Sequence, residues 1–272
     1  MSATDLLDLG GQAALITGAG QGAGRAMALT FAQHNAAVAV NDYVLERAEA
    51  VAGEIRAAGG KAVAVQADVG DLASVTAAFA AAREALGPIT LLVNNAGMAG
   101  PTGGFTMDQT FWQADPAEWA NYINTNLYGV MNCCYVGMPD MVAAKRGRII
   151  TVVSDAGRIG EPRLVAYSGA KAGAAGFMRS LAREAARYNV TCNNISLSSQ
   201  EPATWTAEGW SEERKAEWYA SDAGRDRLQR YPLKRLGKPK DVAAMALFLC
   251  SDAAEWVTGQ TIPVNGGYSF TQ

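Results

Sequence analysis

The chain has 272 residues, of which 49% are hydrophobic and 18% charged, with a formal net charge of −3 at pH 7. This balance is typical of a globular domain with a full core, and it disfavours a surface for nucleic acid or anionic membranes. No segment approaches the roughly 18 apolar residues of a membrane helix, and the start lacks the apolar stretch of a secretory signal. We therefore expect a cytoplasmic protein that binds neither nucleic acid nor membrane.

Histidine and cysteine usage narrows the chemistry further. The sequence has a single histidine, His34, near the end of the first expected helix, where it favours the negative end of the dipole. A Ser/His/Asp hydrolase or a histidine-rich metal site would have to use it, so both are poor candidates and no metal is expected. Four cysteines without a CxxC spacing are expected to be reduced, buried thiols: Cys133, Cys134, Cys192 and Cys250.

Short apolar runs alternate with longer helical patterns along the chain. We expect strands at 13–17, 37–41, 61–66, 89–93, 148–153, 190–195 and 261–264. A helix is expected at 22–34, and a second one follows the second strand and ends at about residue 58. Continuous apolar strands separated by helices predict an α/β fold: a doubly wound (Rossmann) parallel seven-stranded sheet with helices on both faces. No repeat, linker or low-complexity tract divides the chain, so 1–272 is expected to form a single domain.

Two long segments depart from this alternation. Residues 98–112 are rich in glycine and aromatic residues, and residues 201–230 are polar with several tryptophans. Loops of this length in a compact domain are usually functional or disordered. We expect residues 197–230 to form a packed substrate lid, although the aromatic residues fit a subunit interface equally well.

The first strand leads into a glycine-rich turn, Thr17-Gly-Ala-Gly-Gln-Gly-Ala-Gly24, which opens directly into a helix. Glycines allow a tight turn and a close approach of backbone to a pyrophosphate, and a helix N-terminus offers free N–H groups to phosphates. A glycine-rich turn alone is a weak signal that also fits an ordinary loop, but the flanking strand and helix strengthen it. The pattern predicts a dinucleotide site that includes Gly18, Gln21, Gly22 and Gly24.

Asp42, after the second strand, indicates which dinucleotide is bound. A carboxylate there accepts hydrogen bonds from the adenosine ribose hydroxyls and repels a 2′-phosphate. Gln21 and Tyr43 supply no cation for such a phosphate, so NAD is favoured over NADP. Asp42 also fits the N-cap of the next helix. Asp68, after the third strand, suits the adenine edge.

A second group of residues indicates acid–base chemistry. Asn95, Ser154 and Ser196 follow expected strands, at the edge where open parallel sheets bind ligands. Tyr167 and Lys171 are spaced i, i+4 and so share a helix face. A tyrosine base at neutral pH needs its pKa lowered by about three units, to which an ammonium and a cationic nicotinamide contribute. Tyr167 would then exchange a proton with an alcohol or ketone whose oxygen is hydrogen-bonded by Ser154.

Together these motifs resemble the short-chain dehydrogenase/reductase family, of the compact single-domain type, over residues 8–268. They are TGAGQGAG at 17–24, Asp68-Val69, Asn94-Asn95-Ala96-Gly97, Asn126 within NTNLYG, Ser154, Tyr167-Ser-Gly-Ala-Lys171 and VTGQTIPVNGG at 257–267.

The resemblance implies roles for individual residues. Asn126 would hold a water in a proton relay to Lys171, which would also contact the nicotinamide ribose, and Asn95 would support the sheet beside the adenosine ribose. Further cofactor contacts are implied for Asp68, Val69, Ala96, Gly97 and Tyr167. The resemblance also implies a homotetramer, a dimer of dimers that pairs through two long helices at about 116–144 and 167–188.

One position departs from the family pattern. Where the family has a Pro-Gly pair after the sixth strand, this chain has Leu197 and Ser198. The rigid φ of proline and the freedom of glycine are both missing, so we expect the loop to take a different path. Its contacts with the nicotinamide and the shape of the lid would then differ too.

The sequence thus predicts an NAD-dependent oxidoreductase that interconverts a secondary alcohol and a ketone, with Tyr167 as general acid–base. A nucleotide-sensing module on the same fold is disfavoured because the catalytic set is complete, and a lyase or dehydratase is suggested only by the altered loop. The aromatic residues suggest an apolar or cyclic substrate, and alicyclic alcohols, hydroxysteroids and hydroxyacyl thioesters stay open. The basic residues between 214 and 230 fit a solvated helical face better than a CoA phosphate site.

Overall fold

The protein is described here by a computed structural model that covers residues 6–97, 110–202, 205 and 209–270. Its centre is a seven-stranded parallel sheet in the order β3-β2-β1-β4-β5-β6-β7. The strands are β1 (Ala13–Ile16), β2 (Ala37–Asp42), β3 (Ala62–Gln66), β4 (Ile89–Asn94), β5 (Gly147–Ser154), β6 (Val190–Leu197) and β7 (Thr261–Val264). The predicted doubly wound sheet is confirmed, and its strand order reverses between β1 and β4.

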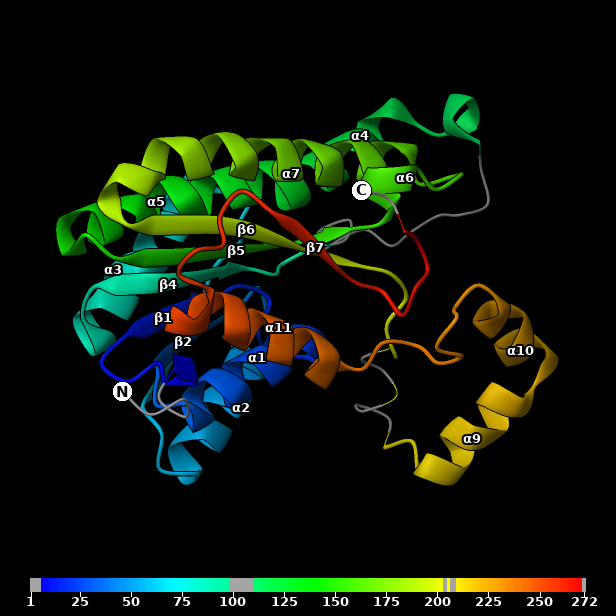
Figure 1. Ribbon diagram of the computed structural model, residues 1–272, viewed down its shortest axis with the longest axis horizontal. Coiled ribbons are helices and arrows are strands. Elements are labelled where there is room, and N and C mark those ends of the chain that lie inside the picture. The colour runs from blue at the N-terminus through cyan, green and yellow to red at the C-terminus, as the bar shows by residue number, and fades with distance from the viewer. Residues whose placement is uncertain (1–5, 98–109, 203–204, 206–208, 271–272) are drawn as a thin grey trace.

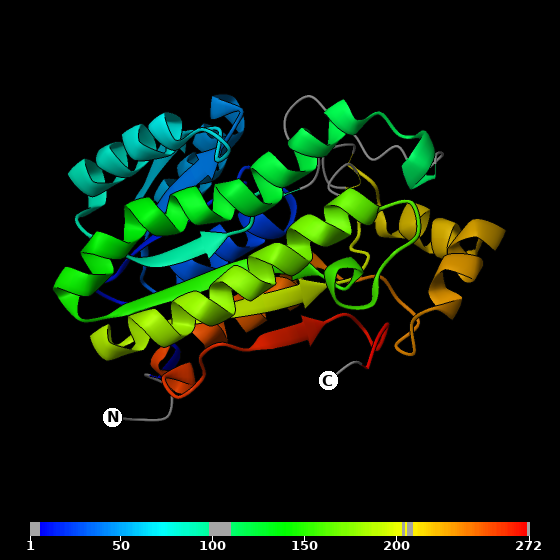
Figure 2. The ribbon, with the colours of Figure 1, turned by 90° about the horizontal axis from the view of Figure 1, so that it is seen from above.

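Helices cover both faces of this sheet (Figures 1 and 2). One face carries α1 (Gly22–Gln33), α2 (Leu45–Ala57) and α11 (Pro239–Cys250), and the other carries α3 (Leu72–Leu86), α5 (Gly129–Ala144) and α7 (Val165–Ala185). Alternate strand residues point to opposite faces, so in β1 Ala14 and Ile16 join the first core and Ala13 and Leu15 the second. This double burial explains why the strands read as continuous apolar runs.

Local signals account for several helix ends. Asp71 caps α3 by accepting the N–H of Ala73 at 2.9 Å, and the chain leaves the helix through Gly87 at φ 87°. His34 is the C-cap residue of α1, as expected from its position. α11 is missing from the helices expected above, although Pro239 stands in its first turn and Asp241 accepts the N–H of Lys238 there at 2.8 Å.

The helix expected at 116–144 is interrupted, so the expectation of one continuous element was wrong. A 3-10 turn η3 (Pro116–Glu118) leads into α4 (Trp119–Ile123), a π-helical turn η4 (Asn124–Tyr128) and only then α5. A π turn adds a residue to the helical repeat and changes the direction of its side chains. The helix expected at 167–188 consists of α7 and the 3-10 turn η5 (Ala186–Tyr188).

After β6 the chain leaves the sheet and forms α9 (Glu212–Ala220) and α10 (Asp222–Gln229), which lie beyond the carboxyl ends of the strands (Figure 1). The Trp205 ring stacks on Trp210 at 4.7 Å between centroids and meets the Trp218 ring edge-on at 5.1 Å. These rings pack on one another in a small core of their own. Ordinary packing of the segment therefore accounts for its tryptophans.

Two of the five basic residues of this segment form ion pairs within it. Lys215 and Arg225 form ion pairs with Glu212 and Asp222, each three residues earlier in the chain. This agrees with a solvated helical face. No described helix is long and apolar enough to cross a membrane, and the described residues contain no group of three or more side chains suited to a metal ion.

Candidate active site

Close contacts that only glycine permits shape the turn after β1. Gly18 and Gly22 have φ values of 61° and 55°, in the region that favours glycine. A Cβ on Gly24 would lie 2.2 Å from the carbonyl oxygen of Gly18 and 2.6 Å from Nδ2 of Asn95. That amide donates to the carbonyls of Thr17 and Gly18 at 2.9 and 3.1 Å, as expected for a supporting role. The turn is thus held against β4, with the N-terminus of α1 beside it.

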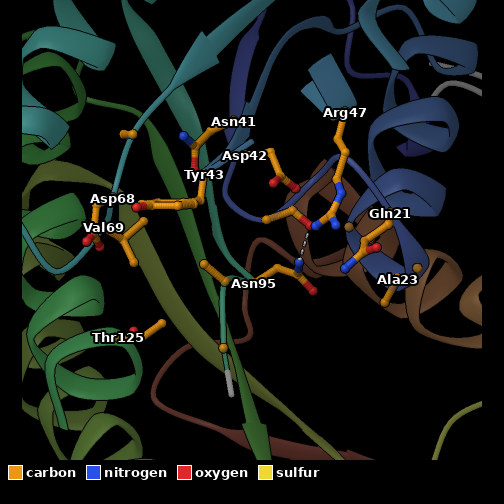
Figure 3. Close-up of a pocket in the computed structure, with 16 residues that line it drawn as sticks. Gln21, Ala23, Asn41, Asp42, Tyr43, Arg47, Asp68, Val69, Asn95 and Thr125 are labelled. Carbon is orange, nitrogen blue, oxygen red and sulfur yellow. Dashed lines mark hydrogen bonds between the residues drawn. The ribbon is translucent and has the colours of Figure 1, made fainter. Parts of the chain in front are cut away.

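A cavity of about 310 Å³ lies at the point where the strand order reverses (Figure 3). Ligands bind at this position in open parallel sheets. Ten residues expected from the sequence to contact a dinucleotide line it: Gly18, Gln21, Gly22, Gly24, Asp42, Asp68, Val69, Asn95, Ala96 and Gly97. The other two expected contacts, Tyr167 and Lys171, lie outside its lining.

Asp42 joins two walls of this cavity. Its Oδ2 accepts the N–H of Gly20 at 3.0 Å and its Oδ1 accepts the N–H of Val44 at 3.0 Å. A Cβ on Gly20 would lie 2.6 Å from Oδ2, so this contact needs the second glycine of the turn, which is absent from the expected site residues. The N-cap of α2 is Val44, so the alternative assignment of Asp42 as that N-cap was wrong.

The cavity also contains a cation that the sequence argument missed. Arg47, in the first turn of α2, lines the cavity beside Asp42 (Figure 3). Its Cβ would lie 2.5 Å from a Cβ added to Gly20, so the arginine stem packs against the glycine-rich turn. Gln21 and Tyr43, which also line the cavity, carry no charge at neutral pH. The available signal was the position of Arg47 one turn into the helix that follows Asp42.

Ser154, Tyr167 and Lys171 come together next to this cavity. Ser154 ends β5 and is hydrogen-bonded to the Tyr167 side chain, which projects from the first turn of α7. Lys171 lies one turn further along α7, with its Nζ 5.8 Å from the centre of the Tyr167 ring. The residue is 4% exposed, and its Nζ donates to the carbonyl of Val152 at 2.8 Å. The i, i+4 spacing therefore brings the two side chains together as expected.

Burial dominates the protonation of both groups. Burial raises the pKa of Tyr167, and the hydrogen bond with Ser154 opposes that change. The expected lowering of the Tyr167 pKa is therefore not supplied by the protein's own groups. Burial lowers the pKa of Lys171 to about 8. The lysine is thus close to losing its proton at mildly alkaline pH.

Asn126 reaches the same place through the π turn. It is fully buried and its Nδ2 donates to the carbonyl of Tyr122 at 2.8 Å. A Cβ on Gly97 would lie 3.1 Å from Nζ of Lys171 and 3.2 Å from Oδ1 of Asn126. Gly97 also lines the cavity beside the glycine-rich turn. The loop after β4 therefore connects the cavity to the four residues expected to carry the chemistry.

Leu197, which stands where the family has the proline of a Pro-Gly pair, is the last residue of a strand. β6 ends at Leu197, two residues later than expected, and Leu197 pairs with Ser154 of β5 and with Val264 of β7. A proline would lack the N–H that a strand between two neighbours uses. The sheet therefore extends up to the residue beside Ser154, and the different path of the loop stays a prediction.

Comparisons with known proteins agree with this geometry. The family model described as short chain dehydrogenase matches residues 12–213. The chain is 37% identical to the 3-oxoacyl-acyl-carrier-protein reductase of Staphylococcus aureus strain Mu50 over 258 residues, covering 94% of this chain and 97% of the relative. It is 35% identical to the 2,3-dihydro-2,3-dihydroxybenzoate dehydrogenase of Bacillus subtilis strain 168, covering 94% and 95%.

A solved structure is similar over almost the whole chain. A 7α-hydroxysteroid dehydrogenase complexed with NADH and 7-oxo glycochenodeoxycholic acid superposes with a TM-score of 0.85 at 32% identity, covering 98% of both chains. The matched family consists of oxidoreductases that use a nicotinamide cofactor. This chain belongs to the short-chain dehydrogenase/reductase family.

Proposed function

We propose that the protein is an NAD-dependent dehydrogenase or reductase that interconverts a secondary alcohol and a ketone. The observation that carries the proposal is the hydrogen-bonded Ser154–Tyr167 pair, with Lys171 beside it, next to a cavity lined by the glycine-rich turn. The glycines and the N-terminus of α1 suit a dinucleotide pyrophosphate. When bound, the nicotinamide would accept or donate the hydride.

In this proposal four side chains share the acid–base chemistry at and behind the reacting oxygen. Tyr167 takes the hydroxyl proton during oxidation and returns it to the ketone oxygen during reduction. Ser154 donates a hydrogen bond to that oxygen and stabilises the charge that develops there. Lys171, whose Nζ lies next to the tyrosine ring, would act together with the bound nicotinamide to favour the phenolate against the effect of burial, and would contact the nicotinamide ribose. Asn126 holds a water that relays protons between Lys171 and the solvent.

Replacement of Tyr167 tests this mechanism. We expect Tyr167→Phe to remove turnover while NADH still binds, since the ring keeps its shape and loses only the hydroxyl. The assay uses purified protein, NAD and separate alicyclic, steroid and hydroxyacyl thioester alcohols, read by NADH absorbance, with the corresponding ketones for the reverse direction. Near-normal turnover by this variant would contradict the mechanism.

Two other functions remain as outcomes of the same assay. NAD binding with no redox turnover of any alcohol or ketone would favour a nucleotide-sensing module. Elimination of water from a hydroxylated substrate without net change in NADH would favour a lyase or dehydratase. The hydrogen-bonded Tyr167–Ser154 pair argues against both, because neither outcome needs a complete dehydrogenase set.

The proposed preference for NAD over NADP rests on Asp42. Its carboxylate is 6% exposed and fixed by two backbone N–H groups, so a 2′-phosphate would meet a negative charge that cannot turn away. The hydroxysteroid dehydrogenase of similar structure is complexed with NADH. Arg47 acts in the opposite direction, because an exposed guanidinium beside the ribose site attracts a phosphate.

A pair of variants separates these two influences. We expect Asp42→Ala to reduce the NAD/NADP ratio of kcat/KM, and Arg47→Ala to raise it. The two kcat/KM values are measured with the same alcohol and each cofactor. An unchanged ratio in Asp42→Ala would refute the ribose contact, and an unchanged ratio in Arg47→Ala would remove the arginine from cofactor choice.

For the substrate we propose an apolar or cyclic secondary alcohol. Beside Tyr167 a cavity of only about 30 Å³, which a substrate would have to widen, is lined by Phe111, Trp119 and Tyr122 together with polar side chains. The Tyr122 ring lies edge-on to Tyr167 at 6.5 Å between centroids. The similar proteins are named for a 3-oxoacyl group, a cyclic dihydrodiol and a hydroxysteroid. Residues 197–230 would cover this substrate as a lid.

We also propose that the protein is a cytoplasmic homotetramer. An apolar groove of about 690 Å³ lies between α5 and α7, where Tyr135 is 74% exposed. A charge in the groove should prevent pairing, so Tyr135→Glu is expected to reduce the mass measured by light scattering. An unchanged tetramer in this variant, or a monomeric parent protein, would contradict the proposal. The four free, buried cysteines suit a reducing compartment.

A further inference from the structure

A buried carboxylate next to Ser154 joins the ends of three strands. Asp155 directly follows β5 and is 1% exposed. Its Oδ1 accepts hydrogen bonds from Oγ of Ser196 at 2.7 Å and from a guanidinium nitrogen of Arg158 at 3.0 Å. Its Oδ2 accepts Nδ2 of Asn265 at 2.7 Å. Since Ser196 belongs to β6 and Asn265 directly follows β7, one side chain ties the carboxyl ends of β5, β6 and β7 together.

The same contacts reach the segment that replaces the family's Pro-Gly pair. The backbone N–H of Asp155 donates to the carbonyl of Leu197 at 2.9 Å. Ser198 donates through its hydroxyl to the carbonyl of Asn265 at 3.1 Å. The amide of Asn265 also donates to the carbonyl of Ser269 at 3.1 Å, so the segment after β7 is held as well. Side chains here fix a path that a proline ring and a glycine would otherwise set.

The energetic cost of this arrangement points to a task beyond stability. A buried carboxylate is costly unless donors satisfy it, and a paired buried charge stabilises a fold no better than apolar packing does. Asp155 has three side-chain donors, and its partner Arg158 is only 15% exposed. The fold keeps this costly group directly beside Ser154, at the edge of the sheet where Tyr167 lies.

We infer that Asp155 is a positioning residue, which acts through Ser196 and Asn265 to hold Ser154 in its hydrogen bond with Tyr167. This inference rests on the proposed dehydrogenase function, because Ser154 and Tyr167 are its proposed reacting groups. The described hydrogen bonds of Asp155 go to other groups than Tyr167, and Asp155 is not part of the cofactor cavity's lining. Its effect on the reaction is expected to come from geometry alone.

The variant Asp155→Asn changes the hydrogen bonds of position 155 without changing the volume of the side chain. The asparagine keeps the size of the side chain, but its Nδ2 then faces either the amide of Asn265 or the guanidinium of Arg158, both of which are donors. In either orientation two buried hydrogen-bond donors face each other, so the ends of the strands must shift. We expect kcat to fall by about tenfold or more while the KM for NAD stays within about twofold, since the cofactor cavity is untouched.

A double variant tests which contact is responsible. Asp155→Asn combined with Asn265→Asp exchanges the carboxylate and the amide, so that one donor and one acceptor face each other again. The amide nitrogen at position 155 then donates to position 265, and the amide oxygen at position 155 still accepts Ser196 and Arg158. The carboxylate at position 265 has no donor for the carbonyl of Ser269, so we expect the double variant to recover only part of the lost kcat, measurably above the value of Asp155→Asn. Failure to recover would overturn the proposed role of the contact between positions 155 and 265.

A matched carboxylate at the other end of the sheet serves as the control. Asp140 also lies in an ion pair, with Arg83 at 2.8 Å, and accepts the N–H of Ile89 at the start of β4. Asp140→Asn is expected to lower the unfolding midpoint and leave kcat unchanged. An equal loss of kcat in both single variants, or an unchanged kcat in Asp155→Asn, would make Asp155 merely structural.

A spectroscopic readout keeps this test separate from the proposed function. In protein labelled with carbon-13 at the tyrosine phenol carbon, the Tyr167 resonance is assigned from the spectrum of Tyr167→Phe. We expect Asp155→Asn to shift this resonance, because the hydrogen bond with Ser154 changes, and the double variant to restore it in part. These changes in chemical shift can be measured even if the protein turns over no alcohol. If Asp155→Asn leaves the Tyr167 resonance unchanged, the inference is overturned.

Discussion

Replacing Lys171 with methionine should stabilise the protein while removing its proposed activity. Burial lowers the Lys171 pKa from 10.5 to about 8, which corresponds to a cost of about 3.4 kcal/mol for keeping the ammonium protonated in the folded state. Methionine has a similar length and carries no charge, so the cost disappears. The variant also loses the hydrogen bond to the carbonyl of Val152, worth about 1 kcal/mol. The net expectation at pH 7 is a gain of about 2 kcal/mol.

This gain should depend on pH in a defined direction. Between about pH 8 and pH 10.5 the unfolded chain binds a proton at position 171 that the folded protein does not, so the stability of the parent protein rises with pH in this window. Below this pH window the full cost of burying the protonated Lys171 side chain is present. At pH 10 only about 0.8 kcal/mol of the cost remains, which the lost hydrogen bond offsets. Lys171→Met should therefore be more stable than the parent at pH 7 and about equal to it at pH 10.

Urea unfolding followed by tryptophan fluorescence measures this difference. Both proteins are compared at pH 7 and pH 10, together with Lys61→Met, which removes an exposed lysine and controls for the loss of a charge. Turnover is measured on the same preparations. A variant less stable than the parent at pH 7, or a stability difference that is the same at both pH values, would refute the argument that burial of Lys171 is costly.

Close packing and burial elsewhere in the molecule lead to three more expectations. Gly24→Ala places a Cβ 2.2 Å from the carbonyl of Gly18 and should cost about 1–3 kcal/mol of stability and weaken NADH binding, measured by urea unfolding and fluorescence titration. Gly97→Ala places a Cβ 3.1 Å from Nζ of Lys171 and should lower kcat more than it lowers NADH affinity, so an unchanged kcat would contradict the site geometry. Burial raises the thiol pKa of all four cysteines, Cys133, Cys134, Cys192 and Cys250. A thiol reagent should therefore label them only in denaturant, and rapid labelling in native buffer would contradict their burial.

The sequence determined the parts of this protein whose physical causes are local. Strands buried on both faces must be apolar throughout, so the seven strands and their parallel arrangement could be predicted from short runs of residues. The turn after β1 requires glycines because of its own backbone angles, and the i, i+4 spacing alone puts Tyr167 and Lys171 on one helix face. The family motifs repeat these local requirements.

Only the tertiary structure decided which distant residues meet at the site. Arg47 reaches the cavity at the strand-order reversal because α2 packs beside the glycine-rich turn. Asn126 lies with Lys171 beside Gly97, on a π turn that interrupts a helix expected to be continuous. The contacts of Asp155 join three strand ends, and its partners on β6 and after β7 lie 41 and 110 positions away in the chain. Periodicity reports how a segment is buried, whereas such contacts depend on how separate segments pack together, and that information is not carried by any one of them.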